Sequence, residues 1–162
     1  MHPLVAHFLI ILLLAAPFLV MVGIGLPPEK RRLLLGATLA VMALGTATTF
    51  LAFATGEAAM AAASSTPHFR VVLEEHKALA ETTRDLFSVL TLGLAVLLFA
   101  PRLLKRDLEP LVDRALLVIY LVYYATGALF LVHTALQGGQ LVRELEAKTA
   151  TTYQMSEKES VR

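Results

Sequence analysis

The sequence predicts an all-α membrane protein, a bundle of four transmembrane helices with both termini on the outer side. Apolar residues make up 57% of the 162 residues and charged residues only 17%, whereas soluble domains are roughly 45–50% apolar and about 25% charged. The charged residues are clustered, and long charge-free runs lie between the clusters. Basic residues gather in two of the connections between these runs, which indicates how the bundle is oriented.

The charge-free runs are the candidate membrane segments, because a spanning helix needs about 20 apolar residues. They cover residues 1–28, 33–56, 86–101 and 115–142. The third run is too short to cross the bilayer by itself, so its helix must begin earlier, near Ala78. The first run lacks the basic residues that open a cleaved signal peptide, so we expect it to be retained as a helix.

The third helix is predicted to begin outside the membrane and to run continuously into it. Apolar and small residues recur at helical spacing along one stripe from Phe69 to Leu90, with His76 among them. Glu81 and Arg84 are expected near the interface. They stand three residues apart on a helix and can partly neutralise each other.

Lysine and arginine set the predicted orientation. The first connection contains Lys30, Arg31 and Arg32. The connection before the fourth helix contains a second basic group, which consists of Arg102, Lys105, Arg106 and Arg114. Since cytoplasmic loops carry the excess of basic residues, both short connections are expected in the cytoplasm and both termini outside.

The chain divides into a four-helix transmembrane domain, residues 1–147, and a polar C-terminal tail, residues 148–162. Gly138 and Gly139 are expected to end or kink the fourth helix. Small residues on one face of the second helix predict close packing against a neighbouring helix. This stripe consists of Gly36, Ala40, Ala43, Ala47 and Ala54.

Histidines are the best candidates for a cofactor site. The predicted topology puts all of them on the outer side: His2, His7, His68, His76 and His133. Imidazole binds haem iron, copper and zinc, and ionisable groups within a membrane are costly and usually functional. The alternative is that interface histidines simply hydrogen-bond to headgroups, water or main-chain carbonyls.

A haem held in a helical bundle needs one or two histidines from facing helices at similar depth. His7 and His133 suit this requirement best, because each is expected about two turns from the outer end of its helix. His76 is the other candidate, since it lies on the apolar stripe. For copper or zinc, the candidate ligands are His7, His76, His133 and His2.

Further polar residues could support such a site. Glu57 and Gln137 are candidate hydrogen-bond partners for a coordinating histidine. Tyr120, Tyr123 and Tyr124 suit either a quinone pocket or a packed core. The sequence contains no phosphate-binding loop, dinucleotide fingerprint or hydrolase motif, so we expect no enzyme activity from the chain on its own. The net charge of +1 and the lack of a basic patch with aromatics argue against a nucleic-acid partner.

Three segments resemble a known family. The opening, His2-Pro3-Leu4-Val5-Ala6-His7-Phe8, resembles the start of a family of small bacterial four-helix inner-membrane proteins of unknown function. Residues 54–58, Ala-Thr-Gly-Glu-Ala, resemble its Thr-Gly segment after helix two. Residues 137–142, Gln-Gly-Gly-Gln-Leu-Val, resemble its Gly-Gly-x-Leu-Val segment after helix four. His76 occupies the place of a histidine that the family tends to carry before helix three.

The sequence also departs from the family. Leu9 stands where the family usually has a proline, and Arg143-Glu144-Leu145 stands where it often has a further His-Gly, which puts any ligand from that region in doubt. The resemblance implies a multi-pass protein of the bacterial inner (cytoplasmic) membrane, with its outer side periplasmic. It also implies a redox neighbourhood, since such domains look like those beside Rieske or cytochrome modules.

The leading hypothesis is a membrane electron-transfer subunit that binds haem b through His7 with His133 or His76. It would pass electrons between a quinol and an outer redox protein or larger respiratory complex. The second hypothesis is a cofactor-free subunit that anchors a membrane complex, and the third is a copper or zinc site. Haem predicts an inward histidine pair at matched depth, and a metal ion predicts three or more nitrogens near one point. The anchor predicts histidines that point away from one another.

Overall fold

The computed structural model describes residues 2–63, 67–105 and 109–160, with side chains described for 7–58, 73–105 and 109–143. The described chain is helical, and its helices are α1 (His2–Gly25), α2 (Pro28–Ala63), α3 (Pro67–Leu103) and α4 (Pro110–Ser160). Each helix contains a segment long and apolar enough to cross a membrane. These segments are His7–Gly25, Pro28–Ala58, Leu73–Leu103 and Pro110–Arg143. The predicted class, a multi-pass bundle of four membrane helices, is confirmed.

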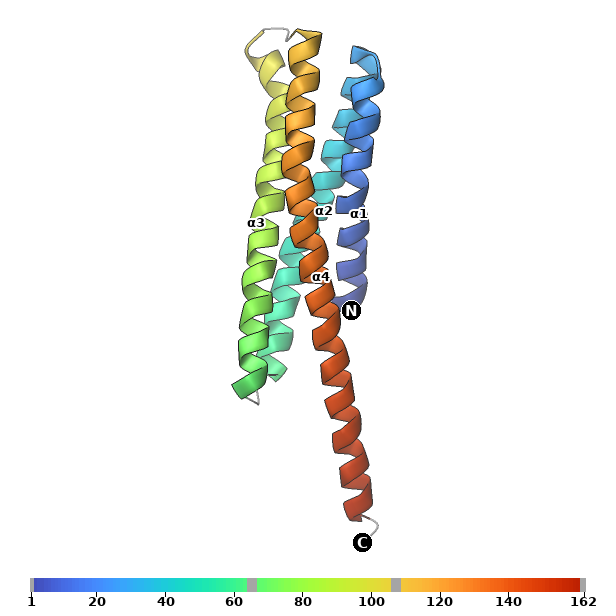
Figure 1. The fold of residues 1–162 in the computed structure, drawn as a ribbon, viewed down its shortest axis with the longest axis vertical. Helices are drawn as coiled ribbons and strands as arrows, with labels where there is room; N and C mark the ends of the chain where they lie inside the picture. The colour runs from blue at the N-terminus through green and yellow to red at the C-terminus, as the bar shows by residue number, and fades with distance from the viewer. Residues whose placement is uncertain (1, 64–66, 106–108, 161–162) are drawn as a thin grey trace.

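The helices run alternately up and down, and α4 returns to lie beside α1 (Figure 1). The pairs in contact are α1–α2, α2–α3, α3–α4 and α1–α4, so the four helices close a ring. The ends of α1 and α3 and the starts of α2 and α4 lie at one end of the bundle, named here the short-loop end. Both chain termini point toward the opposite end (Figure 1), named here the terminal end.

The interior of the ring is filled by large side chains. On α1 the buried residues recur every three or four positions, at Leu9, Leu13, Ala16 and Val20, which is the spacing of one helical face. Phe87 of α3 and Tyr124 of α4 meet at the centre with ring centroids 5.6 Å apart, edge to face. Many large apolar side chains remain exposed on the outside, as expected for a surface that faces lipid.

Hydroxyl groups connect the helices inside this apolar core. The Tyr124 hydroxyl donates to the Leu13 main-chain oxygen at 2.5 Å, and the Tyr120 hydroxyl donates to the Met42 sulfur at 3.1 Å. Threonine hydroxyls pair between neighbouring helices at 2.8 Å and 2.9 Å, in the pairs Thr46–Thr91 and Thr83–Thr134. Interhelical hydrogen bonds of this kind contribute to helix association in membranes. They fix the depth of each helix relative to its neighbours.

Of the two outcomes expected at Gly138 and Gly139, an end or a kink, the end does not occur. Helix α4 is 51 residues long and runs through both glycines to Ser160, so it continues into residues 148–160 of the predicted tail. A glycine inside a helix costs only about 1 kcal/mol relative to alanine. Because unpaired main-chain groups are far more costly in lipid, two glycines do not suffice to end the helix there.

The small-residue stripe does not face a neighbouring helix. Ala40, Ala43, Ala47 and Ala54 are exposed. The opposite side of α2 is buried and contains Thr38 and Thr49, whose hydroxyls donate to main-chain oxygens of their own helix at 2.8 and 2.7 Å. Threonines satisfied in this way are cheap to bury.

Arg84 also differs from expectation. It pairs with Asp85 at 2.8 Å rather than with Glu81. Its guanidinium carbon lies over the rings of Phe50 and Phe53 of α2, at 5.4 and 4.9 Å from their centroids. This cation–π contact draws the side chain toward α2.

Candidate functional site

His7 and His133 lie on the outward faces of their helices, and both are exposed. Each stands two residues from a buried leucine, Leu9 on α1 and Leu131 on α4. Two residues correspond to about 200° around a helix. The inward pair that the haem hypothesis predicted is therefore not formed within this bundle.

The two histidines do lie on neighbouring helices and on the same side of the bundle's middle. The hydrogen bond from Tyr124 to Leu13 ties α4 to α1. His7 lies six residues from Leu13, and His133 lies nine residues from Tyr124, both toward the terminal end. These separations are roughly 9 Å and 14 Å along the helices. At this level the interior is occupied by packed side chains, including Leu131.

His76 is half-buried and lies at a different level. Its ring packs against α4 at Gly138, where an added Cβ would lie 3.1 Å from the ring Cε1 and 3.5 Å from Nε2. His76 is seven residues beyond Thr83, whose hydroxyl meets Thr134, so it lies roughly 10 Å beyond that threonine pair. Since His133 adjoins Thr134, these two histidines are separated along the bundle.

The remaining candidates do not converge on a histidine. Glu57 forms an ion pair with Lys77 at 2.6 Å between α2 and α3. Gln137 is half-buried on α4, next to the glycine that receives His76. The side chains of His2 and His68 lie outside the described residues. Within the part of the chain whose side chains are described, no group of three or more His, Cys, Asp or Glu residues is arranged to hold a metal ion.

The tyrosines of α4 divide between the core and the surface. Tyr120 and Tyr124 are buried and hydrogen-bonded to neighbouring helices, whereas Tyr123 is 67% exposed. Of the two alternatives for these tyrosines, a quinone pocket or a packed core, Tyr120 and Tyr124 therefore follow the second.

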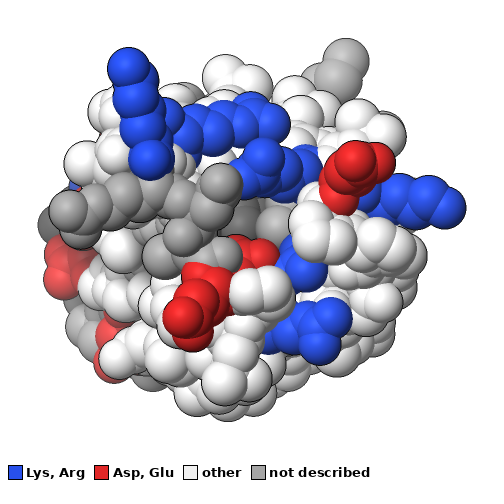
Figure 2. All heavy atoms as spheres, turned by 90° about the horizontal axis from the view of Figure 1, so that it is seen from above, with Lys and Arg blue, Asp and Glu red and all other residues white. Residues whose placement is uncertain are grey.

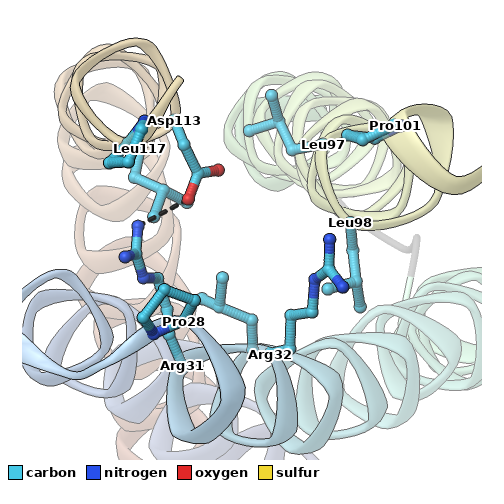
Figure 3. A pocket seen from close by; sticks show the side chains of 10 residues that line it. Pro28, Arg31, Arg32, Leu97, Leu98, Pro101, Asp113 and Leu117 are labelled. Atoms are coloured by element: carbon cyan, nitrogen blue, oxygen red, sulfur yellow. Dashed lines mark hydrogen bonds and ion pairs between the residues drawn. The ribbon is translucent and has the colours of Figure 1, made fainter. Parts of the chain in front are cut away.

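Sequence reasoning missed a part-buried ion pair at the short-loop end. Arg31, near the start of α2, donates to Asp113, near the start of α4, at 2.5 Å. Arg31 is only 2% exposed. The pair borders a pocket of about 290 Å³ between α2, α3 and α4 (Figure 3). A signal was present: Asp113 is an acid in the first turn of a helix, close to the basic connections.

Comparisons with known proteins add no family or homologue: no protein-family model, curated protein or solved structure matches this chain.

Proposed function

We propose that the chain is a cofactor-free structural subunit that anchors a partner protein at the bacterial inner membrane. The observation that carries this proposal is the direction of the histidines: His7 and His133 face away from the bundle. The neighbouring Leu9 and Leu131 are buried in the interior, and next to His133 the hydroxyl pair Thr83–Thr134 joins α3 to α4. An anchor needs a stable bundle and an exposed face, and it needs no internal cofactor.

The proposed orientation puts the short-loop end in the cytoplasm and both termini in the periplasm. Figure 2 looks onto the short-loop end and shows Lys and Arg side chains spread over it. The described cations near this end are Lys30, Arg31, Arg32, Arg102, Lys105 and Arg114. An excess of basic residues on the cytoplasmic side supports this orientation.

The projecting part of α4 is the proposed attachment point for the partner. Beyond Arg143, where the apolar span ends, α4 continues as a helix to Ser160. This projection is roughly 26 Å long at 1.5 Å per residue. It extends past the other three helices (Figure 1). We propose that a protein in the periplasm, such as a redox protein or part of a respiratory complex, binds along it.

Two measurements test the anchor proposal. Purified full-length protein, expressed with ample haem, should give no Soret band when oxidised or dithionite-reduced and no stoichiometric copper or zinc. A Soret band that disappears in His7→Ala or His133→Ala would overturn the proposal.

The second measurement concerns α4. In native gels of gently solubilised membranes, the full chain should migrate in a larger complex that is lost on truncation after Arg143. Truncation should leave the transmembrane bundle folded, which a thermal melt in detergent checks. If the truncated chain stays in the same complex, the projection is not the attachment point.

A second candidate is a haem b shared between this chain and another subunit. It is favoured by one observation: His7 and His133 face outward from adjacent helices, at comparable distances from the hydrogen bond that joins α1 to α4. A haem there would supply electron transfer between a quinol and an outer redox partner. A partner's helix would have to enclose it. The native complex, but not the isolated chain, would then show a Soret band, and His7→Ala would shift it.

A further inference from the structure

The pocket at the short-loop end is lined partly by basic side chains and partly by apolar ones. Arg31 and Arg32 come from the first turns of α2 and stand on two sides of it (Figure 3). Its apolar lining includes Leu35, Leu97 and Leu117 from three different helices. Its volume of about 290 Å³ is at the small end of the ~300–1,000 Å³ range of ligand pockets. The space suits a headgroup rather than a whole amphiphile.

The charges of the pocket favour an anion. Among the described lining residues, Arg31 and Arg32 contribute two cationic groups and Asp113 one carboxylate. The pocket also lies beside the starts of α2 and α4, where helix dipoles favour negative groups.

Arg31 also has a donor that its ion pair leaves unused. One terminal nitrogen of its guanidinium bonds to Asp113. Its Nε is buried and makes no hydrogen bond to the described residues. Buried donors in native proteins almost always have a partner, and an unmade bond to a charged group is costly. If the guanidinium turned toward the pocket, a ligand oxygen would satisfy this donor.

The position of the pocket selects the kind of anion. Its lining residues stand at the ends of the membrane spans, which begin at Pro28 and Pro110 and end at Leu103. Headgroups lie at this level of a bilayer, outside its hydrocarbon core. Basic pockets between transmembrane helices bind anionic lipid headgroups. The lining leucines Leu35, Leu97 and Leu117 would contact the lipid's glycerol and upper acyl carbons.

We infer that this pocket binds the phosphate headgroup of an anionic phospholipid, with Arg31 Nε and the Arg32 guanidinium donating to the phosphate oxygens. Asp113, which also lines the pocket, holds Arg31 in position through their ion pair. The inference is independent of the proposed anchoring function, because it concerns the opposite end of the bundle.

Native mass spectrometry of the full chain in detergent tests this inference, with phosphatidylglycerol and phosphatidylcholine of identical acyl chains as probes. We expect one phosphatidylglycerol per chain, bound at least tenfold more tightly than phosphatidylcholine. Arg32→Gln should weaken phosphatidylglycerol binding about tenfold, the usual effect of losing a hydrogen bond to a charged group. Arg31→Lys keeps a cation opposite Asp113 but removes the Nε donor, and it should weaken binding as well.

Two matched controls distinguish binding at this pocket from a general attraction of anionic lipid to basic residues. Arg102→Gln removes an exposed cation at the same end that does not line the pocket, and it should change affinity less than twofold. Leu97→Trp fills the pocket without changing charge and should abolish the preference for phosphatidylglycerol. Its control, Val96→Trp, alters a neighbouring residue that is 61% exposed and should have no effect.

Several results would overturn the inference. Equal binding of both lipids would show that the headgroup charge is not recognised. An equal loss in Arg102→Gln would show that the whole basic end attracts lipid without a site. Retained selectivity in Leu97→Trp would place the lipid elsewhere. Displacement of phosphatidylglycerol by an equal concentration of inorganic phosphate would assign the pocket to the free ion instead.

Discussion

Gly45 is the point where α2 approaches α1 most tightly among the glycines described, and replacing it with alanine tests the packing of the whole bundle. A Cβ at this position would lie 2.7 Å from Leu13 Cδ2 and 3.0 Å from Leu13 Cγ. Leu13 is fully buried, and its main-chain oxygen is bonded by Tyr124. The leucine therefore has little room to move away from the added methyl group.

The size of the effect follows from two opposing terms. Forcing an extra methyl group into a packed core costs about 1–3 kcal/mol. Alanine regains about 0.8–1.0 kcal/mol of helix propensity over glycine. The net loss for Gly45→Ala is then about 1 kcal/mol, or about fivefold in the unfolding equilibrium.

Two other glycines provide the comparison. A Cβ at Gly36, also on α2, would meet nothing within 4 Å, so Gly36→Ala should be neutral or stabilising by up to about 1 kcal/mol. A Cβ at Gly127 would lie 2.8 Å from the tip of Leu90, and its effect should fall between the two. The assay is reversible unfolding in mixed micelles of increasing SDS content, followed by circular dichroism. If Gly45→Ala and Gly36→Ala have the same stability, the packing of α1 on α2 described above is incorrect.

Three further predictions use the same unfolding assay. Tyr124→Phe should cost about 0.6 kcal/mol, the average for an interhelical hydrogen bond in a membrane, and a gain in stability would contradict the bond. Thr83→Val and Thr134→Val should be non-additive, because either change alone breaks their shared hydrogen bond; strictly additive losses would count against the pair. Asp113→Leu should lower the stability of the bundle by about 3 kcal/mol, because it leaves the buried guanidinium of Arg31 without its counter-charge. Arg31→Met should cost less, since it leaves a carboxylate whose side chain is 37% exposed, and the reverse ranking would refute this explanation.

The helices were predictable from sequence because charge and length decide what can cross a bilayer. The predicted continuity of the third helix is confirmed by α3, which runs without a break from Pro67 to Leu103. The predicted stripe through His76 is also found on the inward face of α3, where Thr83, Phe87 and Leu90 are buried. That stripe could be recognised because the first half of α3 is amphipathic and carries charges on its other faces.

The inward faces of the other helices were not predictable for a physical reason. Lipid is as apolar as the interior of the bundle, so hydropathy does not distinguish the two sides of a membrane helix. His7 on α1 and the alanines of α2 were expected to face inward, but both face outward. The close approach in α2 occurs at Gly45, which is buried against Leu13, whereas the neighbouring Ala43 and Ala47 are exposed.

The site was less predictable than the fold, because it depends on which side chains meet. The pairing of Arg31 with Asp113 joins residues 82 positions apart, and no local pattern links them. The Gly138–Gly139 segment was expected to end or kink the helix, and no sequence pattern indicated that the His76 ring packs against the main chain of Gly138.

The continuity of α4 has a mechanical consequence. A single helix of 51 residues is roughly 77 Å long, more than twice the thickness of the ~30 Å hydrocarbon core. Its buried part is held by Tyr120 and Tyr124, while its last roughly 26 Å lie beyond the apolar span. A tilt of about 10° within the bundle would move the far tip by about 4–5 Å relative to the membrane surface. The helix would thereby act as a lever that converts small changes in packing between α1 and α4 into larger displacements outside the bilayer.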